Sequence, residues 1–412
     1  MMLPQPSLSF TLPSIHDNTK LDCRVYHPTC LNVSLGSSDV SLWPRHAAVV
    51  AHPYAPLGGS YEDPVVHLIA DTLLQAGFVV ATFNFRGASS SDGRTSWTSK
   101  PERADYMSVA GFLVYYIHYL HPPQRLDAAA AADEGSPPPT FLFAGYSYGA
   151  MVTLQLPPLD SILSLFSSPS THTPLADIRL RAQHLAEQQV IISITPSSPR
   201  KSLGMRIGGG EDTSPHKSHD RPRVRAHSHD REERIRKGVK DLLSRNKLIH
   251  RRRDHNPTDR FRETNHVEPC LAKVDDLIKF TSAYLLVSPP LGIVTNLATM
   301  TFSNPWPSWS RRRRGGPSTT KHQGGDAEKE EVEAELKLIR NTTLVIYGDQ
   351  DGFLTLRKMR DWTTQLSSAQ GSRFRHVDIS GAGHFWIEEG VLYELREAVS
   401  SFAATFVGGR SS

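Results

Sequence analysis

The chain has 412 residues and a mass of 45.8 kDa, enough for two average domains or one large one, so a disulfide-stapled miniprotein is excluded. Hydrophobic residues make up 38% of it and charged residues 21%, with 29 Pro and 28 Gly, which indicates a globular part diluted by polar sequence. The net charge of +4 is localised, because residues 200–262 hold 19 Lys and Arg against 9 Asp and Glu. The rest of the chain is net negative, which excludes a phosphate-binding surface spread over the whole molecule.

The cysteines and the apolar runs bear on the compartment. Cys23, Cys30 and Cys270 cannot all pair and show no zinc-ligand spacing, which favours a reducing compartment with no structural zinc. No cofactor is predicted. Residues 1–20 lack a basic segment followed by an apolar one, and no run approaches about 18 apolar residues, so neither a secretory signal nor a membrane span is predicted. The predicted location is the cytoplasm, with nuclear entry through the Arg-rich tracts as the alternative.

Short β-branched runs alternate with helical patterns along the chain, which is typical of a parallel sheet covered by helices. The elements predicted in chain order are strands over 46–51, 77–85, 140–144, 284–288, 343–347 and 375–379, and helices over 64–77, 103–120 and 388–406. The predicted fold class is therefore α/β.

Two polar stretches interrupt this alternation. Residues 197–265 and 308–330 are too rich in charged and small side chains to bury enough apolar surface to offset chain entropy, so we expect disorder there, with a transient helix over 233–248. Both stretches fall between strands and are interpreted as insertions into one domain. The predicted division of that domain is an N-terminal part, a continuation and a C-terminal part, over residues 1–196, 266–307 and 331–412.

The sharpest chemical signal is GYSYG at residues 145–149, a G-x-S-x-G between the strand 140–144 and the helix-forming residues that follow. A hydroxyl nucleophile has to stand clear of its own backbone. A sharp strand-to-helix turn achieves this only where the flanking residues lack side chains that would collide. Ser147 is therefore the predicted nucleophile.

A serine hydroxyl becomes nucleophilic when a base takes its proton and a carboxylate orients that base. His384 follows the last predicted strand, and Asp349 and Asp351 follow the strand before it, so in a parallel sheet all would share an edge with Ser147. We predict His384 as the base. Asp351 is favoured as the acid because it lies further past its strand, while Asp349 remains an alternative acid or a turn-capping residue.

The loop HPYAPLGG at residues 52–59 follows the first predicted strand. Acyl transfer needs backbone N–H donors for the developing oxyanion, one from the residue after the nucleophile and one from such an earlier loop. Tyr148 is the first by position. Because Pro53 has no N–H, Tyr54 is the predicted second donor, the alternative being that this loop is merely a turn.

These loops, together with FNFRG at residues 83–87, resemble the α/β-hydrolase superfamily, and more narrowly small intracellular serine hydrolases with HP-x-x-x-x-GG, F-N-F-R-G and G-[FY]-S-[FY]-G motifs. The resemblance covers residues 45–156 and 280–406. It implies the α/β-hydrolase fold, a mostly parallel sheet with helices on both faces, and Asp351 as the usual acid. It also implies that Asn84 and Arg86 shape a turn near the site.

The same resemblance places residues 156–185 where this superfamily commonly inserts a cap, and the run after FNFRG, residues 88–93, departs from it by lacking an early glycine. Aromatic residues flank the proposed site. Tyr146, Phe385 and Trp386 are predicted to line an apolar acyl or leaving-group pocket, with core packing as an equal explanation for the last two.

The predicted function is a serine hydrolase that cleaves a carboxylic ester, thioester or small amide through an acyl-enzyme, with a small acyl compound as its partner and no metal. The alternative is a non-catalytic scaffold of the same fold that binds a polyanion or an import receptor through its basic insertion. Nucleic acid is disfavoured as that partner, because no aromatic residues are interleaved with the cations.

Overall fold

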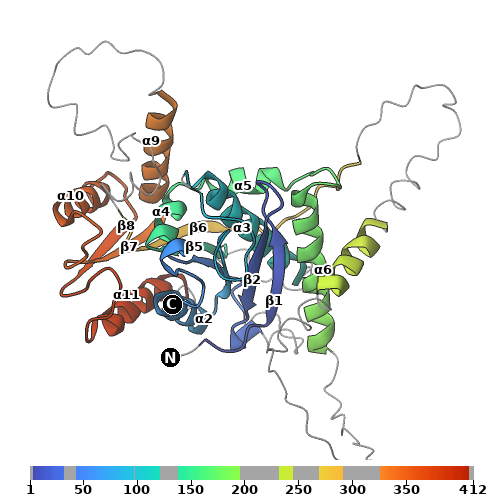
Figure 1. Ribbon diagram of the computed structural model, residues 1–412, viewed down its shortest axis with the longest axis horizontal. Helices are drawn as coiled ribbons and strands as arrows, with labels where there is room; N and C mark the ends of the chain where they lie inside the picture. The colour runs from blue at the N-terminus through green and yellow to red at the C-terminus, as the bar shows by residue number, and fades with distance from the viewer. Residues whose placement is uncertain are drawn as a thin grey trace, which may run out of the picture.

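The computed structural model contains one sheet of eight strands in the order β1-β2-β4-β3-β5-β6-β7-β8 (Figure 1). The residues it describes are 3–31, 43–96, 98–120, 138–194, 232–244, 269–290 and 325–407. The strands are β1 (Leu8–Pro13), β2 (Lys20–Tyr26), β3 (Ala47–Ala51), β4 (Val79–Phe83), β5 (Thr140–Tyr146), β6 (Thr281–Val287), β7 (Thr342–Gly348) and β8 (Phe374–Ile379). Strands β3 to β8 pair in parallel, and β2 is antiparallel to β1 and β4.

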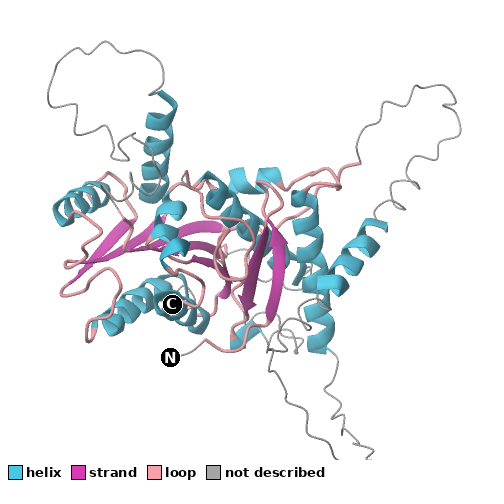
Figure 2. Cartoon of the chain, viewed as in Figure 1, coloured by secondary structure: helices cyan, strands magenta, loops and turns pink. Residues whose placement is uncertain are grey.

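Helices cover both faces of this sheet, as Figure 2 shows. Helices of this fold are η2 (Ala55–Leu57), α2 (Pro64–Gln75), α3 (Lys100–Leu120), α4 (Tyr148–Leu154), α5 (Leu159–Leu165), α6 (Pro174–Ile194), α9 (Gly325–Arg340), α10 (Leu356–Ser367) and α11 (Val391–Val407). One core layer is formed with α2 and α11, and the other with α3 to α6, α9 and α10. The prediction of an α/β-hydrolase fold, mostly parallel with helices on both faces, is confirmed.

The central strands are buried along their whole length, whereas the first strand is not. All five residues of β3 and of β4 are buried, as expected for parallel strands covered on both faces. In β1, buried and half-buried residues alternate at first, because one side of this edge strand is less covered. The sequence pattern predicts no element before residue 46, so β1 and β2 are additions to the expected sheet.

Part of the basic insertion is folded, at the place where the sequence predicts a transient helix over residues 233–248 within a disordered stretch. A helix over residues 232–244 packs on α6 and buries the apolar side chains Ile235, Val239 and Leu242. Glu232 accepts hydrogen bonds from Arg181 of α6 (2.8 Å) and from Thr11 of β1 (2.9 Å). A side chain at Gly238 would collide with the ring of His184, so the two helices touch closely. The other residues of 197–265 lie outside those described.

The second predicted insertion is also shorter than expected. Helix α9 begins at Gly325, inside the stretch 308–330, and its Glu- and Lys-rich sequence suits a helix better than a loop. The segment expected to form a cap, residues 156–185, contributes α5 and α6. Helix α6 lies along α3 and contacts β1, so it extends one helical layer of the sheet (Figure 1).

The order of the strands fixes where a ligand can bind. The chain passes from β3 outward to β4 and then returns to the other side of β3 to form β5. In open parallel sheets, ligands bind beyond the carboxyl ends of the strands at such a reversal of order. The loops that follow β3 and β5 are the ones that carry the motifs at 52–59 and 145–149.

Candidate active site

Ser147 occupies a sharp turn between β5 and α4, with φ 54° and ψ −118°. Its N–H donates to the carbonyl of Val287 at the end of β6 (2.8 Å). A Cβ on Gly149 would lie 2.5 Å from the carbonyl oxygen of Ala51, and one on Gly145 would collide with the backbone of Gly149. Both glycines are therefore required by close backbone approach, as the motif predicts.

The structure brings Ser147, His384 and Asp351 together. The Oγ of Ser147 lies 2.8 Å from Nε2 of His384, and Nδ1 of His384 lies 2.8 Å from Oδ2 of Asp351. All three residues are buried, and the Asp351 side chain has no exposed area. Because a carboxylate only accepts, Nδ1–H donates to Asp351, which leaves Nε2 to accept the serine proton.

The two carboxylates of the loop after β7 have different partners. Asp351 accepts from the His384 ring and, through Oδ1, from the N–H of Phe353 (2.8 Å). Asp349 accepts from the N–H of Gly381 (2.7 Å) and the hydroxyl of Ser380 (3.2 Å), and so caps the turn before the histidine. The geometry therefore places Asp351 beside His384, while Asp349 binds the loop that carries His384.

The aromatic residues predicted to line a pocket near His384 divide into two buried side chains and one exposed ring. Tyr146 is buried and donates from its hydroxyl to the carbonyl of His384 (2.7 Å). Trp386 is also buried, with its Nε1 donating to Ser288 Oγ (3.2 Å). Phe385 is 57% exposed. Of the three residues predicted to line a pocket, only Phe385 presents its ring to solvent, and the other two belong to the core.

The loop after β3 is tied to the neighbouring turn by a buried histidine. Phe85 donates its N–H to Nε2 of His52 (2.9 Å), so Nδ1–H of His52 donates to the carbonyl of Pro53 (2.6 Å). Burial lowers the pKa of His52 to about 4, which keeps the ring neutral in this role. The histidine of the HP motif is thus a structural clip for this loop.

The side chains of the two residues predicted to supply the oxyanion donors are in contact. The rings of Tyr54 and Tyr148 are 5.1 Å apart, and Tyr148 is the first residue of α4. Neither backbone N–H has an acceptor among the residues that the structure describes. A free N–H at the start of a helix is expected, because the first turn has no preceding carbonyl to bind.

The turn of FNFRG is held by ion pairs. Arg86 is buried and donates to both oxygens of Asp105 (2.7 and 3.0 Å), and to Asp17 (2.9 Å). Asn84 accepts from the N–H of Tyr61 (2.9 Å). These contacts agree with a shaping role rather than a chemical one. In the run after this turn, where an early glycine is missing, Ser89 takes φ 46°.

Sequence reasoning missed one neighbour of the base. The ring of Phe353 packs on that of His384 with 4.4 Å between centroids, and its N–H holds Asp351. It stands two residues after the acid, and an aromatic residue in that place carries no motif of its own. His52 was part of a predicted loop, but its hydrogen bond with the N–H of Phe85 joins residues 33 apart in the chain. No local sequence pattern indicates such a contact.

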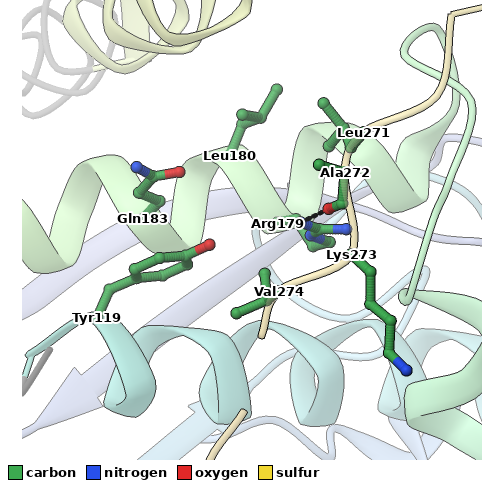
Figure 3. A pocket seen from close by; sticks show the side chains of 8 residues that line it. All are labelled: Tyr119, Arg179, Leu180, Gln183, Leu271, Ala272, Lys273 and Val274. Carbon is green, nitrogen blue, oxygen red and sulfur yellow. Dashed lines mark hydrogen bonds between the residues drawn. The ribbon is translucent and has the colours of Figure 1, made fainter. Parts of the chain in front are cut away.

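A separate cavity of about 270 Å³ lies between α3, α6 and residues 271–274 (Figure 3). The residues that line it are Tyr119, Arg179, Leu180, Gln183, Leu271, Ala272, Lys273 and Val274. Arg179 donates to the carbonyls of Phe166 (3.1 Å) and Ala272 (2.8 Å), which gives it a structural task there. None of the residues around Ser147 lines this cavity.

Over the described ranges, no group of three or more His, Cys, Asp or Glu side chains is arranged to hold a metal ion. No helix in those ranges has the length and apolar character needed to cross a membrane.

The arrangement of the strands and the contact of Ser147, His384 and Asp351 beyond their carboxyl ends define the protein as one with an α/β-hydrolase fold. No protein-family model and no curated protein matches the chain. Among solved structures it is similar to an α/β serine hydrolase without lid from Xanthomonas campestris (16% identity, all of both chains, TM-score 0.41). It is also similar to an α/β serine hydrolase homologue from Coxiella burnetii (14%, 97% of this chain and 98% of that one, 0.40). An esterase from Pyrococcus furiosus is a further match (11%, 97% and 89%, 0.41), and none of these identities is high enough to transfer a substrate.

Proposed function

We propose that the protein is a serine hydrolase that cleaves a carboxylic ester, thioester or small amide through an acyl-enzyme. The observation that carries this proposal is the continuous chain of contacts from Ser147 through His384 to Asp351, each link being 2.8 Å. Those distances are within the reach that a nucleophile, its base and the orienting acid require. The strained φ of Ser147 supports the same role, because such strain persists where the surrounding structure fixes a functional residue.

In this mechanism His384 takes the proton of Ser147 through Nε2 while the hydroxyl oxygen attacks the carbonyl carbon. The backbone N–H groups of Tyr54 and Tyr148 stabilise the oxyanion of the tetrahedral intermediate. Asp351 holds the imidazolium that forms. The imidazolium then gives its proton to the leaving oxygen, sulfur or nitrogen, the acyl-enzyme remains on Ser147, and a water activated by His384 releases the acid.

The surroundings of the base favour an apolar group in the substrate. Phe385 is exposed beside His384, and Ile387 is 82% exposed two residues further on. Leu57, in the loop of the proposed oxyanion donor, is 72% exposed. Apolar side chains exposed on loops around a buried polar triad are suited to cover an apolar acyl or leaving group. We expect Phe385→Ser to lower kcat/KM for long-chain p-nitrophenyl esters by about tenfold, and for the acetate much less.

The test of the proposed function is labelling of the purified protein by a fluorophosphonate probe. The wild type should be labelled, and Ser147→Ala and His384→Ala should not be, while both remain folded by circular dichroism. Ser161→Ala is the matched control, because Ser161 is an exposed serine on α5. A folded wild type that resists the probe, or equal labelling of Ser147→Ala, would reject the hydrolase and favour the scaffold alternative.

A further inference from the structure

The helix behind the nucleophile is short and its far end is held from outside. Helix α4 has seven residues, and the last carbonyls of any helix have no partner within it. The Nζ of Lys337 donates to the carbonyls of Thr153 (3.4 Å), Leu154 (2.8 Å) and Leu156 (2.5 Å). The remaining carbonyl of this stretch, that of Gln155, accepts from Arg103 of α3 (3.4 Å). Four consecutive carbonyls therefore each face a side-chain donor of Lys337 or Arg103, and we call these two residues the α4 clamp.

Lys337 is an unusual residue to find in this place. Its side chain is only 6% exposed, and its Nζ lies 5.3 Å from the centre of the Tyr284 ring. Burial lowers the pKa of Lys337 to about 7, with Glu333 on the same helix opposing the shift and Arg103 adding to it. A buried amine is costly to keep in a fold unless its donors are used. Here they are used on the end of α4.

The clamp connects the two parts of the proposed site. Lys337 belongs to α9, which leads directly into β7, and the loop after β7 carries Asp351. Helix α4, which it holds, begins immediately after Ser147, and Figure 1 shows the end of α9 beside α4. Seven residues of helix span about 10 Å, so a shift at one end of this rigid element is passed to the other.

We infer that Lys337, with Arg103, is a positioning residue that holds α4 so that the Ser147 hydroxyl and the Tyr148 N–H stay aligned with His384. This inference rests on the proposed function, because its catalytic consequence requires Ser147 to be the nucleophile. Small misplacements of the reacting groups reduce turnover strongly, while the affinity for the substrate changes little. The clamp should therefore act on kcat rather than on KM.

The test compares Lys337→Gln, Lys337→Arg and Leu338→Ala in the full-length protein. Leu338 is the next residue of α9 and is fully buried, so its truncation loosens α9 without removing a donor from α4. With p-nitrophenyl acetate, Lys337→Gln should lose about tenfold in kcat with KM nearly unchanged, and Lys337→Arg should recover part of the loss. Arg103→Gln should show the same pattern more weakly, and it carries the test if Lys337→Gln does not fold.

Amide hydrogen exchange over residues 148–154 gives a readout that does not depend on activity. Exchange there should be faster in Lys337→Gln than in Leu338→Ala, each measured under conditions of equal global stability. Equal kcat in wild type and the clamp variants, or an equal effect of Leu338→Ala on kcat and exchange, would overturn the inference. If the wild type itself shows no Ser147-dependent activity, the proposed function fails and the catalytic role of the clamp fails with it.

Discussion

The loops at the carboxyl edge of the sheet differ from the helical layer behind them in where their determinants lie along the chain. The groups proposed to do chemistry stand in short loops that follow strands, such as residues 145–149 and 52–59. The support of α4 comes instead from Lys337, which is 181 to 184 residues away from the carbonyls it binds. The residues proposed for chemistry are thus recognised from short stretches of sequence. The residue that supports α4 is distant in the chain from the helix that it holds. This difference can be tested by comparing a variant of a proposed catalytic residue with a variant of a residue that only holds the same loop in place.

The largest separation is expected between the two carboxylates after β7. Asp351→Asn should lower kcat on an activated ester by about 10³- to 10⁴-fold, because the amide no longer holds the neutral imidazole in the required tautomer or stabilises the imidazolium that forms. Asp349→Asn keeps an acceptor for the N–H of Gly381 and should stay within about threefold of wild type. Steady-state kinetics of the two folded variants decide the matter. Similar losses in both would show that chemistry and support are not divided between them.

His52 is expected to act through stability alone, in a defined pH window. Its folded pKa of about 4 lies below the ordinary value of 6.5, so above pH 6.5 the neutral ring is stable in both states. As the pH falls from 6.5 to 4, the unfolded chain binds a proton that the folded one refuses, and about 3 kcal/mol of stability is lost. Urea unfolding at pH 7 and pH 4 should show that the wild type loses this much more than His52→Gln. If the wild type and His52→Gln lost the same unfolding free energy between pH 7 and pH 4, His52 would not be a buried neutral histidine in the folded protein.

Ser147 combines the proposed nucleophilic role with a strained backbone, and substitution should separate the two. Ser147→Gly and Ser147→Ala should both be inactive, but glycine accepts φ 54° and should be more stable than alanine by about 1 kcal/mol. Thermal unfolding of the two variants measures this difference. An alanine variant as stable as the glycine variant would mean that the turn stores no strain at this residue.

Ser89 has a strained backbone but no proposed catalytic role, and the smallest effect on stability is expected there. It is exposed and takes φ 46°, at the run where the resemblance leads one to expect a glycine. Ser89→Gly should stabilise the protein by about 0.5 kcal/mol, since relief of the left-handed backbone exceeds the added entropy of the unfolded chain. Activity should not change. Urea unfolding measures the effect, with Ser89→Ala as the control. A Ser89→Gly variant less stable than the wild type would contradict this explanation.

Much of the sheet and the contact between Ser147, His384 and Asp351 could be anticipated from sequence, because buried parallel strands are continuous apolar runs and each turn at their ends demands glycine or proline. Strands β1 and β2 could not, since polar residues interrupt them and they are recognised by pairing rather than by a continuous apolar run. The helix over 232–244 overlaps the transient helix predicted over 233–248, but its packing could not be predicted, because only the partner surface on α6 makes its apolar face effective.

The pocket residues show a second limit of sequence. Tyr146 precedes the proposed nucleophile, and Trp386 stands two residues after the proposed base, so their place in the chain alone suggested contact with substrate. Alternation along β5 and the turn at Trp386 instead direct both side chains into the core, where their polar atoms bind the His384 carbonyl and Ser288. Nearness in sequence to a reactive residue does not determine which way a side chain faces.

The most direct test of the central claim is mass spectrometry of the protein quenched in acid during turnover of p-nitrophenyl acetate. An acyl-enzyme mechanism predicts an acetyl adduct on the peptide that contains Ser147, more of it when deacylation is slow, and none in Ser147→Ala. An adduct on another residue, or hydrolysis that persists undiminished in Ser147→Ala, would contradict the account.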